Sequence, residues 1–121
     1  MHEIRLGNIE GIFANIIWDN APLSTREMVM LAEDALGWKR TTTYTVLKKL
    51  CDRGIFALND RMVTVLISKP EFYAIQSEQF VKDNFQSSLP AFLAAFTSRQ
   101  KVSTKDLEEI KKLVDSLEET V

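Results

Sequence analysis

The sequence predicts a mostly α-helical protein with one small β-hairpin, divided into a head at residues 1–69 and a helical arm at residues 70–121. Three observations lead to this fold class. Apolar residues recur at helical spacing in three successive stretches of the first half. Two short β-prone runs follow, and the remaining patterns are helical. With 121 residues and 45% hydrophobic content, the chain is long enough for one globular domain with an appendage.

The first two expected helices are core elements of the head. Ser24 and Glu27 have the spacing of a capping box, which predicts the start of the second helix, and Gly37 predicts its end. The first helix ends before Pro22 and carries an apolar stripe: Ile9, Ile12, Phe13, Ile16 and Ile17. The second helix carries its own stripe: Met28, Leu31, Ala32, Ala35 and Leu36.

The third expected helix combines one apolar face with one face of hydroxyl groups and positive charge. Its inward stripe has helical spacing: Thr43, Val46, Leu47, Leu50 and Cys51. Gly54 supplies a left-handed residue that ends the helix. The opposite face and the N-terminal end carry the residues that we expect to contact DNA: Lys39, Arg40, Thr41, Thr42, Tyr44, Thr45, Lys48 and Lys49. Backbone N–H groups at a helix N-terminus also favour an anionic phosphate.

The charge of the chain is distributed unevenly. Its net charge of −2 gives no nucleic-acid signature for the chain as a whole. Residues 38–54, however, contain five basic side chains and one acidic side chain, whereas residues 70–121 contain six basic and nine acidic ones. The positive field is therefore local to the third helix.

The two β-prone runs, Ile55 to Leu58 and Met62 to Ile67, are expected to form a hairpin around Asn59-Asp60-Arg61. Three helices followed by a hairpin is the element order of a winged helix-turn-helix domain, whose third helix reads the major groove. Arg61 at the hairpin tip is placed to touch phosphate or reach a minor groove, although an exposed arginine in a turn is usually just solvated.

The arm contains more apolar side chains than some fifty residues can bury alone. Pro90 suits the start of a short helix, and Ser103 or Thr104 caps the last one, whose apolar seam continues to Val121. The economical solution is a homodimer of interlocked arms that holds two heads at a fixed separation, and the alternative is an arm folded back on its own head. The expected dimer interface is Phe72, Phe80, Phe85, Phe92, Phe96, Leu107, Ile110, Val114 and Leu117.

The residues of enzyme and metal sites are scarce. His2 is the only histidine, and no glycine-rich phosphate loop or cluster of cysteine and histidine is present, so we expect no catalysis, no metal and no cofactor. Cys51 is expected to be a small core residue, with a redox-sensing thiol or an intermolecular bridge as alternatives. Without a signal peptide or an apolar run long enough to span a membrane, the chain is expected to be cytoplasmic and not inserted in the membrane.

Over essentially its whole length the chain resembles the penicillinase and methicillin-resistance repressors, the BlaI/MecI type. In the head, the residues that carry the resemblance most strongly are Ile16-Ile17-Trp18, Trp38, Thr42, Thr45, Leu47, Leu50 and Arg53-Gly54-Ile55. The second half, SLPAFLAAFTSRQKVSTKDLEEIKKLVDSLEE, is similar to the dimerisation arm of that family. The hairpin departs from the family because NDR replaces the longer Gly-Arg tip often found there.

This resemblance implies a cytoplasmic bacterial repressor that binds a dyad-symmetric operator as a dimer and blocks transcription. In such families a membrane sensor and proteolysis of the arm often relieve repression. The family's cleaved Asn-Phe bond corresponds here to Ala95-Phe96. Copper-responsive relatives carry a cysteine-rich site near the C-terminus, which this sequence lacks. The operator, the regulated genes and the inducing signal stay open.

Two functions of other classes remain as alternatives. The first is a winged-helix module that binds protein through the same surface. The local positive charge argues against it, because protein-binding surfaces favour aromatic anchors over lysine and threonine. The second is a regulator that senses a small ligand in an aromatic pocket of the arm, lined by Phe72, Phe80, Phe85, Phe92 and Phe96. Such a cluster is more often dimer core.

Overall fold

A computed structural model describes residues 6–119, so that His2 and Val121 lie outside the described residues. By its own contacts the chain divides after Gln79 into two compact units, the first unit and the second unit. The elements follow in the order α1 (Asn8–Asn20), β1 (Leu23–Ser24), α2 (Thr25–Leu36), α3 (Arg40–Asp52), β2 (Phe56–Asn59), β3 (Met62–Val65), α4 (Lys69–Phe85), α5 (Leu89–Arg99) and α6 (Thr104–Glu119). The expected fold class, mostly α with a small β-hairpin and a winged helix-turn-helix head, is confirmed.

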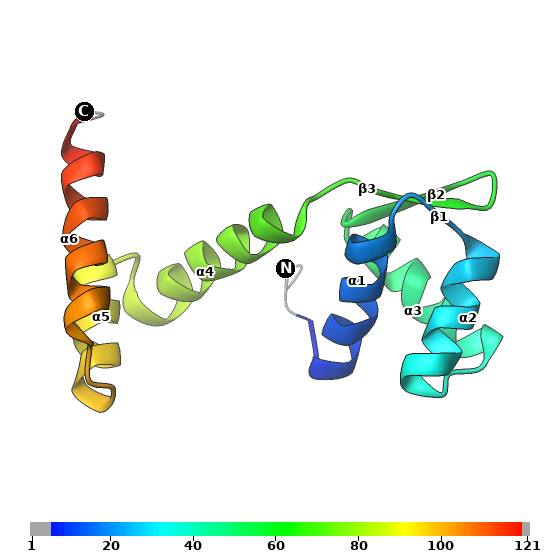
Figure 1. Cartoon of the computed structure of the whole chain (residues 1–121), viewed down its shortest axis with the longest axis horizontal. Coiled ribbons are helices and arrows are strands. Elements are labelled where there is room, and N and C mark those ends of the chain that lie inside the picture. Colours follow the sequence, from blue (N-terminus) through cyan, green and yellow to red (C-terminus); the bar gives the residue numbers. More distant parts are fainter. Residues whose placement is uncertain (1–5, 120–121) are drawn as a thin grey trace. The chain divides into compact units, whose positions relative to one another are not determined.

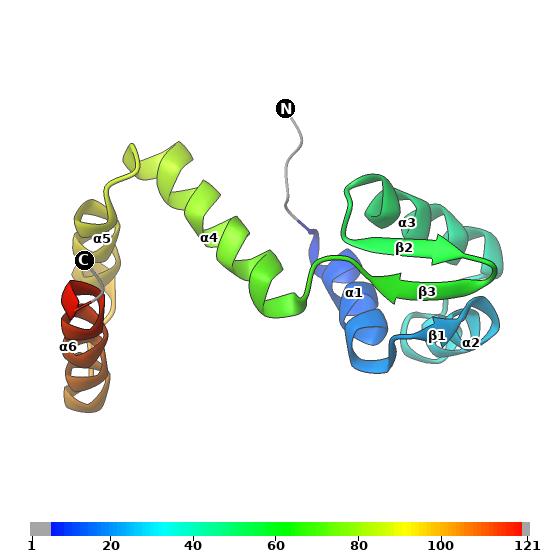
Figure 2. The ribbon, with the colours of Figure 1, turned by 90° about the horizontal axis from the view of Figure 1, so that it is seen from above.

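In the first unit, α1, α2 and α3 lie on one face of a small antiparallel sheet (Figures 1 and 2). The strand order is β1-β3-β2. The hairpin pairs Phe56 with Val65 at one end and Asn59 with Met62 at the other. The strand β1, in which Leu23 pairs with Val63, was not expected from the sequence. With only two residues, β1 is too short to show a period of two.

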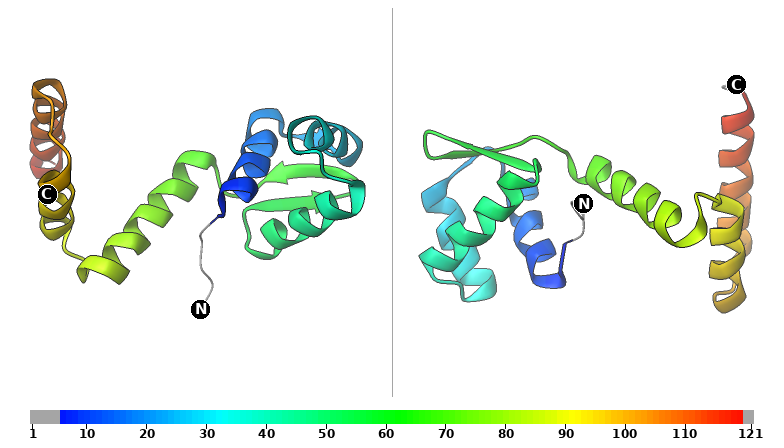
Figure 3. Two further views of the ribbon diagram at one scale, coloured as in Figure 1. Left: turned by 90° about the horizontal axis from the view of Figure 1, so that it is seen from below. Right: turned by 180° about the vertical axis from the view of Figure 1, so that it is seen from behind.

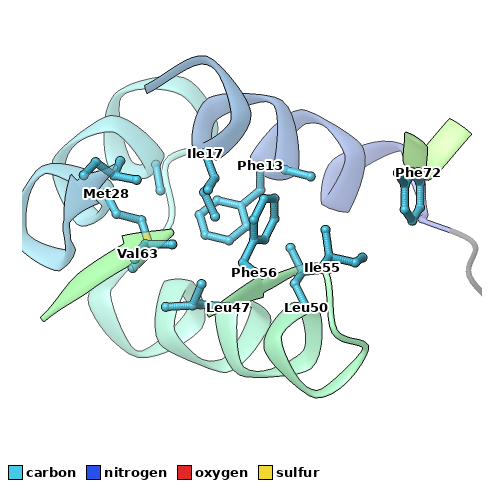
Figure 4. Packing of buried hydrophobic residues seen from close by; sticks show 12 residues of the cluster. Phe13, Ile17, Met28, Leu47, Leu50, Ile55, Phe56, Val63 and Phe72 are labelled. Atoms are coloured by element: carbon cyan, nitrogen blue, oxygen red, sulfur yellow. The ribbon is translucent and has the colours of Figure 1, made fainter. Parts of the chain in front are cut away.

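The core of the first unit lies between these helices and the sheet (Figure 4). Side chains from α1, α2 and α3 meet Phe56 and Val63 of the sheet there. The largest fully buried side chains are Phe13, Phe56, Phe72, Ile17, Leu23, Met28, Leu47, Leu50, Ile55, Val63 and Thr43. Because interiors pack densely, this shared core fixes α3 against the hairpin.

The helix ends have the signals that the sequence predicted. The Ser24 hydroxyl accepts a hydrogen bond from the Glu27 N–H at 3.1 Å, which is the N-cap bond of the expected capping box, and it donates one to the Glu27 carboxylate at 3.2 Å. Gly37 and Gly54 adopt left-handed φ angles of 66° and 80° after α2 and α3. Of the two candidates for the α6 cap, it is Ser103 whose hydroxyl accepts the N–H of Asp106.

Some residues expected on buried stripes are exposed. Ile9 and Ile12 in α1 are 56% and 47% exposed, and Ala35 in α2 is exposed as well. The core covers only the part of α1 around Phe13 and Ile17, so the apolar stripe of this helix is wider than the surface that covers it. Cys51 is half-buried against the core rather than enclosed in it.

Phe72 does not belong to the expected dimer interface. The structure buries it completely, with its ring centroid 5.6 Å from that of Trp18. Trp18 also packs edge-on against Phe56, and its indole N–H donates to the Ile67 carbonyl at 3.0 Å. These contacts attach the start of α4 to the first unit, which is why that unit extends to Gln79 instead of ending at residue 69.

The second unit consists of the end of α4 with α5 and α6 (Figure 3). The rings of Phe80, Phe85 and Phe92 form a cluster with centroids 5.6 to 6.1 Å apart. Neither α5 nor α6 contains a fully buried residue. On α6, an apolar stripe lies exposed: Leu107, Ile110, Leu113, Val114 and Leu117. Within the described residues, the second unit therefore has no closed hydrophobic core of its own.

Candidate nucleic-acid interface

The candidate site is the polar face of α3. Thr43, Leu47 and Leu50 are buried against the core, and this turns the opposite face of the helix outward. At 3.6 residues per turn, Thr41, Thr45 and Lys48 form the centre of the outward face. Arg40 and Tyr44 lie on one flank, and the other flank carries Thr42 and Lys49. Among the nine expected contact residues, Tyr44 is half-buried and the others are exposed: Lys39, Arg40, Thr41, Thr42, Thr45, Lys48, Lys49 and Arg61.

The threonines of α3 have different partners. The Thr43 hydroxyl is buried and donates to the Lys39 carbonyl at 3.0 Å. Thr43 therefore packs in the core, and its hydroxyl is hydrogen-bonded within its own helix. The Thr45 hydroxyl is exposed and donates to the Thr41 carbonyl at 2.8 Å. The hydroxyl proton of Thr45 is therefore already used in a hydrogen bond within the helix, whereas the lone pairs of its oxygen and its methyl group stay accessible. Such a threonine can accept a hydrogen bond from a base or contact a thymine methyl group.

Positive charge gathers at the start of α3. Lys39 is the N-cap residue, and its side chain makes no capping hydrogen bond. The N–H groups of the first turn have no partner within the helix and favour an anion, as do the side chains of Lys39 and Arg40. The Arg40 guanidinium lies 5.6 Å from the centre of the Tyr44 ring, a cation–π contact that orders it on the helix flank.

The side chains of Arg53 and Trp38, which flank α3 in the sequence, contact α1 and do not contribute to the exposed face of α3. Arg53 pairs with Glu10 of α1 at 3.6 Å, so its charge is engaged at the back of the helix end. Trp38 packs its ring against Phe13 at a centroid distance of 5.2 Å.

Burial, and then the neighbouring Asp52, raises the pKa of the Cys51 thiol above its usual value of 9.0. Cys51 is therefore protonated at neutral pH, as a packing residue would be.

The hairpin has a tighter turn than the sequence suggested. Asn59 pairs with Met62, so the turn consists of Asp60 and Arg61 alone. Both have left-handed φ angles, 49° and 63°, as in the type I′ turn that suits two-residue hairpins. The Arg61 carbonyl accepts a hydrogen bond from the Thr25 N–H at 2.9 Å. The hairpin tip is thereby held at the start of α2.

Sequence reasoning missed one basic residue beside this interface, Arg26. It is exposed on the first turn of α2 and lines the same hollow as Arg40, Tyr44 and Arg61. Local sequence patterns gave no indication of its role, because the β1–β3 pairing and the Thr25–Arg61 hydrogen bond, both between residues far apart in the sequence, bring it to the hairpin tip.

The described residues contain no group of three or more histidine, cysteine, aspartate or glutamate side chains that could hold a metal ion. In the same part of the chain, no helix combines the length and apolar content that crossing a membrane requires. The arrangement offers an exposed helix with basic, hydroxyl and methyl groups, flanked by a hairpin whose tip carries an arginine. That geometry suits groove and phosphate recognition.

Comparison with curated proteins gave no match. The family model of the penicillinase repressors matches residues 6–116, which is nearly the whole chain. The match includes α1 to α5 and most of α6, so it covers both units. The chain belongs to the penicillinase repressor family, a family of DNA-binding transcriptional repressors.

Proposed function

We propose that this protein is a homodimeric, sequence-specific repressor that blocks transcription at a dyad-symmetric operator, with α3 of each copy in the major groove. The observation that carries the proposal is the exposed face of α3, where Thr41, Thr45 and Lys48 lie side by side without an opposing carboxylate within ion-pair distance in the described chain. Threonine and lysine can contact base edges there, while Lys39, Arg40 and Lys49 hold register on phosphates.

The second unit supports the homodimer. Its α6 carries an apolar stripe, and Leu113 and Leu117 are 59% and 55% exposed. An exposed stripe of this length is unfavourable in water and is typical of a surface that another chain covers. The i, i+3, i+4 spacing along α6 is that of a helix that pairs with another helix. A second copy presents the same stripe, so a two-fold interface buries both at once.

The test is fluorescence anisotropy with labelled duplex from upstream of the protein's own gene and with a scrambled duplex, each over a salt series. We expect tight binding to the upstream duplex and weak binding to the scrambled one, with log affinity falling linearly against log salt. Lys48→Ala should weaken binding, whereas Lys105→Ala on α6 serves as the charge-matched control. Equal weak binding to both duplexes would contradict sequence-specific recognition.

The bond between Ala95 and Phe96 bears on how repression would end. It lies inside α5, and Phe96 lies among the residues that line a hollow of about 540 Å³ between α5 and α6. A protease needs its substrate extended, so cleavage at this bond requires α5 to open first. Relief of repression by proteolysis at this bond therefore depends on local unfolding of the second unit.

The same hollow favours a second candidate function, the sensing of a small apolar ligand. Phe92, Leu93 and Leu113 are among its lining residues, and its walls are mostly apolar. If the second copy fills the hollow, candidate apolar ligands should leave the melting temperature unchanged. A concentration-dependent rise in melting temperature, abolished in Leu93→Asp, would favour ligand sensing instead.

A further inference from the structure

A hollow of about 450 Å³ lies between α2, α3 and the hairpin tip of the first unit. Three of its lining residues are arginines, and each comes from a different element: Arg26 from α2, Arg40 from α3 and Arg61 from the β2–β3 turn. Among the residues that the structure describes, no acidic side chain lines it. The remaining walls are Thr25, Val29, Met30 and Tyr44.

The backbone fixes two of the three arginines relative to each other. The Thr25 N–H donates to the Arg61 carbonyl at 2.9 Å, which joins the residue before Arg26 to the hairpin tip. Arg61 adopts a left-handed φ of 63°, a conformation that is unfavourable for a residue with a Cβ atom. Such backbone strain concentrates at functional sites, where it aims a side chain. Here the strained residue is one of the three arginines of the hollow.

The third arginine is ordered by a ring. The Arg40 guanidinium lies over Tyr44, which also lines the hollow. In residues 6–119 none of the three guanidinium groups forms an ion pair with a carboxylate. Three like charges gathered around one hollow repel each other, and the described residues supply no anion that would compensate them. The arrangement is therefore suited to an anion from outside.

We infer that this hollow binds one phosphodiester group of the duplex backbone, with Arg26 as a contact residue beside Arg40 and Arg61. Guanidinium groups fit phosphate oxygens through paired N–H donors, which favours arginine over lysine at such a site. Val29 and Met30 offer an apolar wall for the adjoining deoxyribose. The inference deepens the proposed function and rests on it, because the strands that border a groove occupied by α3 present their phosphates to the helix flanks.

The test compares Arg26→Ala, Arg26→Lys and the charge-matched control Lys105→Ala in the full chain. Phosphate contacts carry no sequence information, so Arg26→Ala should weaken binding to the upstream and the scrambled duplex by the same factor. From the usual strength of a charge-assisted hydrogen bond, we expect affinity to fall about tenfold for each bound first unit. The salt slope should fall by about 0.9 for each phosphate that the variant no longer neutralises. Arg26→Lys should weaken binding to an intermediate extent.

Ethylation of backbone phosphates locates the contact. In the wild type, ethylation at one phosphate of each half-site should interfere with binding. Arg26→Ala should reduce the interference at that phosphate and at no other, because Arg40 and Arg61 still contact it. Arg26 is exposed, so an unchanged melting temperature should show that the variant folds. If Arg26→Ala binds like Lys105→Ala, the inference is overturned while the proposed function stands. If the wild type binds neither duplex, the proposed function and this inference are both overturned.

A free phosphorylated molecule is the other source of the same chemistry. Inorganic phosphate and adenosine monophosphate at millimolar concentration are the probes. If either raises the melting temperature of the wild type but not of Arg26→Ala, and duplex affinity is equal in both proteins, the hollow is a small-ligand site and the inference is overturned. No shift in either protein, together with the duplex result above, supports the backbone phosphate.

Discussion

Replacing Arg61 with glycine separates the stability cost of the hairpin turn from its use in DNA binding. Arg61 holds a φ of 63° in a two-residue turn. A left-handed conformation costs a residue with a Cβ atom about 1–2 kcal/mol, whereas glycine adopts it freely. Glycine also gives the unfolded chain more conformational freedom, which lowers the free energy of unfolding by about 0.5–1 kcal/mol. The net expectation for Arg61→Gly is a gain of about 0.5–1 kcal/mol in the free energy of unfolding.

Thermal denaturation followed by circular dichroism measures this gain. For a folding unit of this size, a change of 1 kcal/mol shifts the melting temperature by about 4–8 °C, so Arg61→Gly should melt about 2–8 °C higher. The same variant should bind the upstream duplex about tenfold more weakly for each bound first unit, because one guanidinium group that binds phosphate is removed. Stability and DNA affinity should therefore move in opposite directions.

Arg61→Val is the matched control. It also removes the guanidinium group, but a β-branched residue is disfavoured at positive φ, so stability should fall while DNA affinity falls as in Arg61→Gly. A lower melting temperature for Arg61→Gly than for the wild type would refute the argument from the left-handed turn. An unchanged DNA affinity in both variants would show that Arg61 is merely solvated.

Three further predictions concern base recognition by α3, the separate roles of Phe72 in the first unit and Leu117 in the second, and the thiol of Cys51. Thr45→Ala should relax base preference at one operator position with a small decrease in affinity, and Lys48→Ala should weaken binding, both measured by anisotropy against single-base variants. Phe72→Ala should cost about 3–5 kcal/mol in urea unfolding at any protein concentration, whereas Leu117→Ala should increase the monomer fraction in sedimentation experiments. Because burial raises the pKa of the Cys51 thiol, the unfolded chain loses that proton first. Stability should then fall as the pH rises above 9.0, and this decrease should be absent from the pH profile of Cys51→Ala.

Local signals in the sequence were sufficient to predict most of the first unit. Ser24 and Glu27 cap α2, and Gly54 ends α3, because each of these roles depends on only a few neighbouring residues. The helical spacing of Thr43, Leu47 and Leu50 likewise placed the polar face of α3 outward. The expected contacts with DNA follow from that face and stay predictions.

Features that depend on distant residues could not be predicted from local patterns. The apolar pattern of α4 contained no indication that Phe72 packs against Trp18, which is 54 residues earlier in the sequence. Ile9 shows the opposite case, since it fits the stripe of α1 but has no covering neighbour in the described structure. Periodicity tells which side chains share a face, but it does not tell how far the opposing surface extends.

The short strand β1 explains why the hairpin tip is part of the interface. Leu23 and Val63 are both buried and face each other across the β1–β3 pair, so the core itself holds β3 beside the start of α2. The Thr25–Arg61 hydrogen bond extends that pairing to the turn. The tip is consequently positioned by the same core that orients α3, and a strained Arg61 can persist because the surrounding contacts fix its backbone. A hairpin attached only by its own turn would leave that arginine free to move away from Arg26 and Arg40.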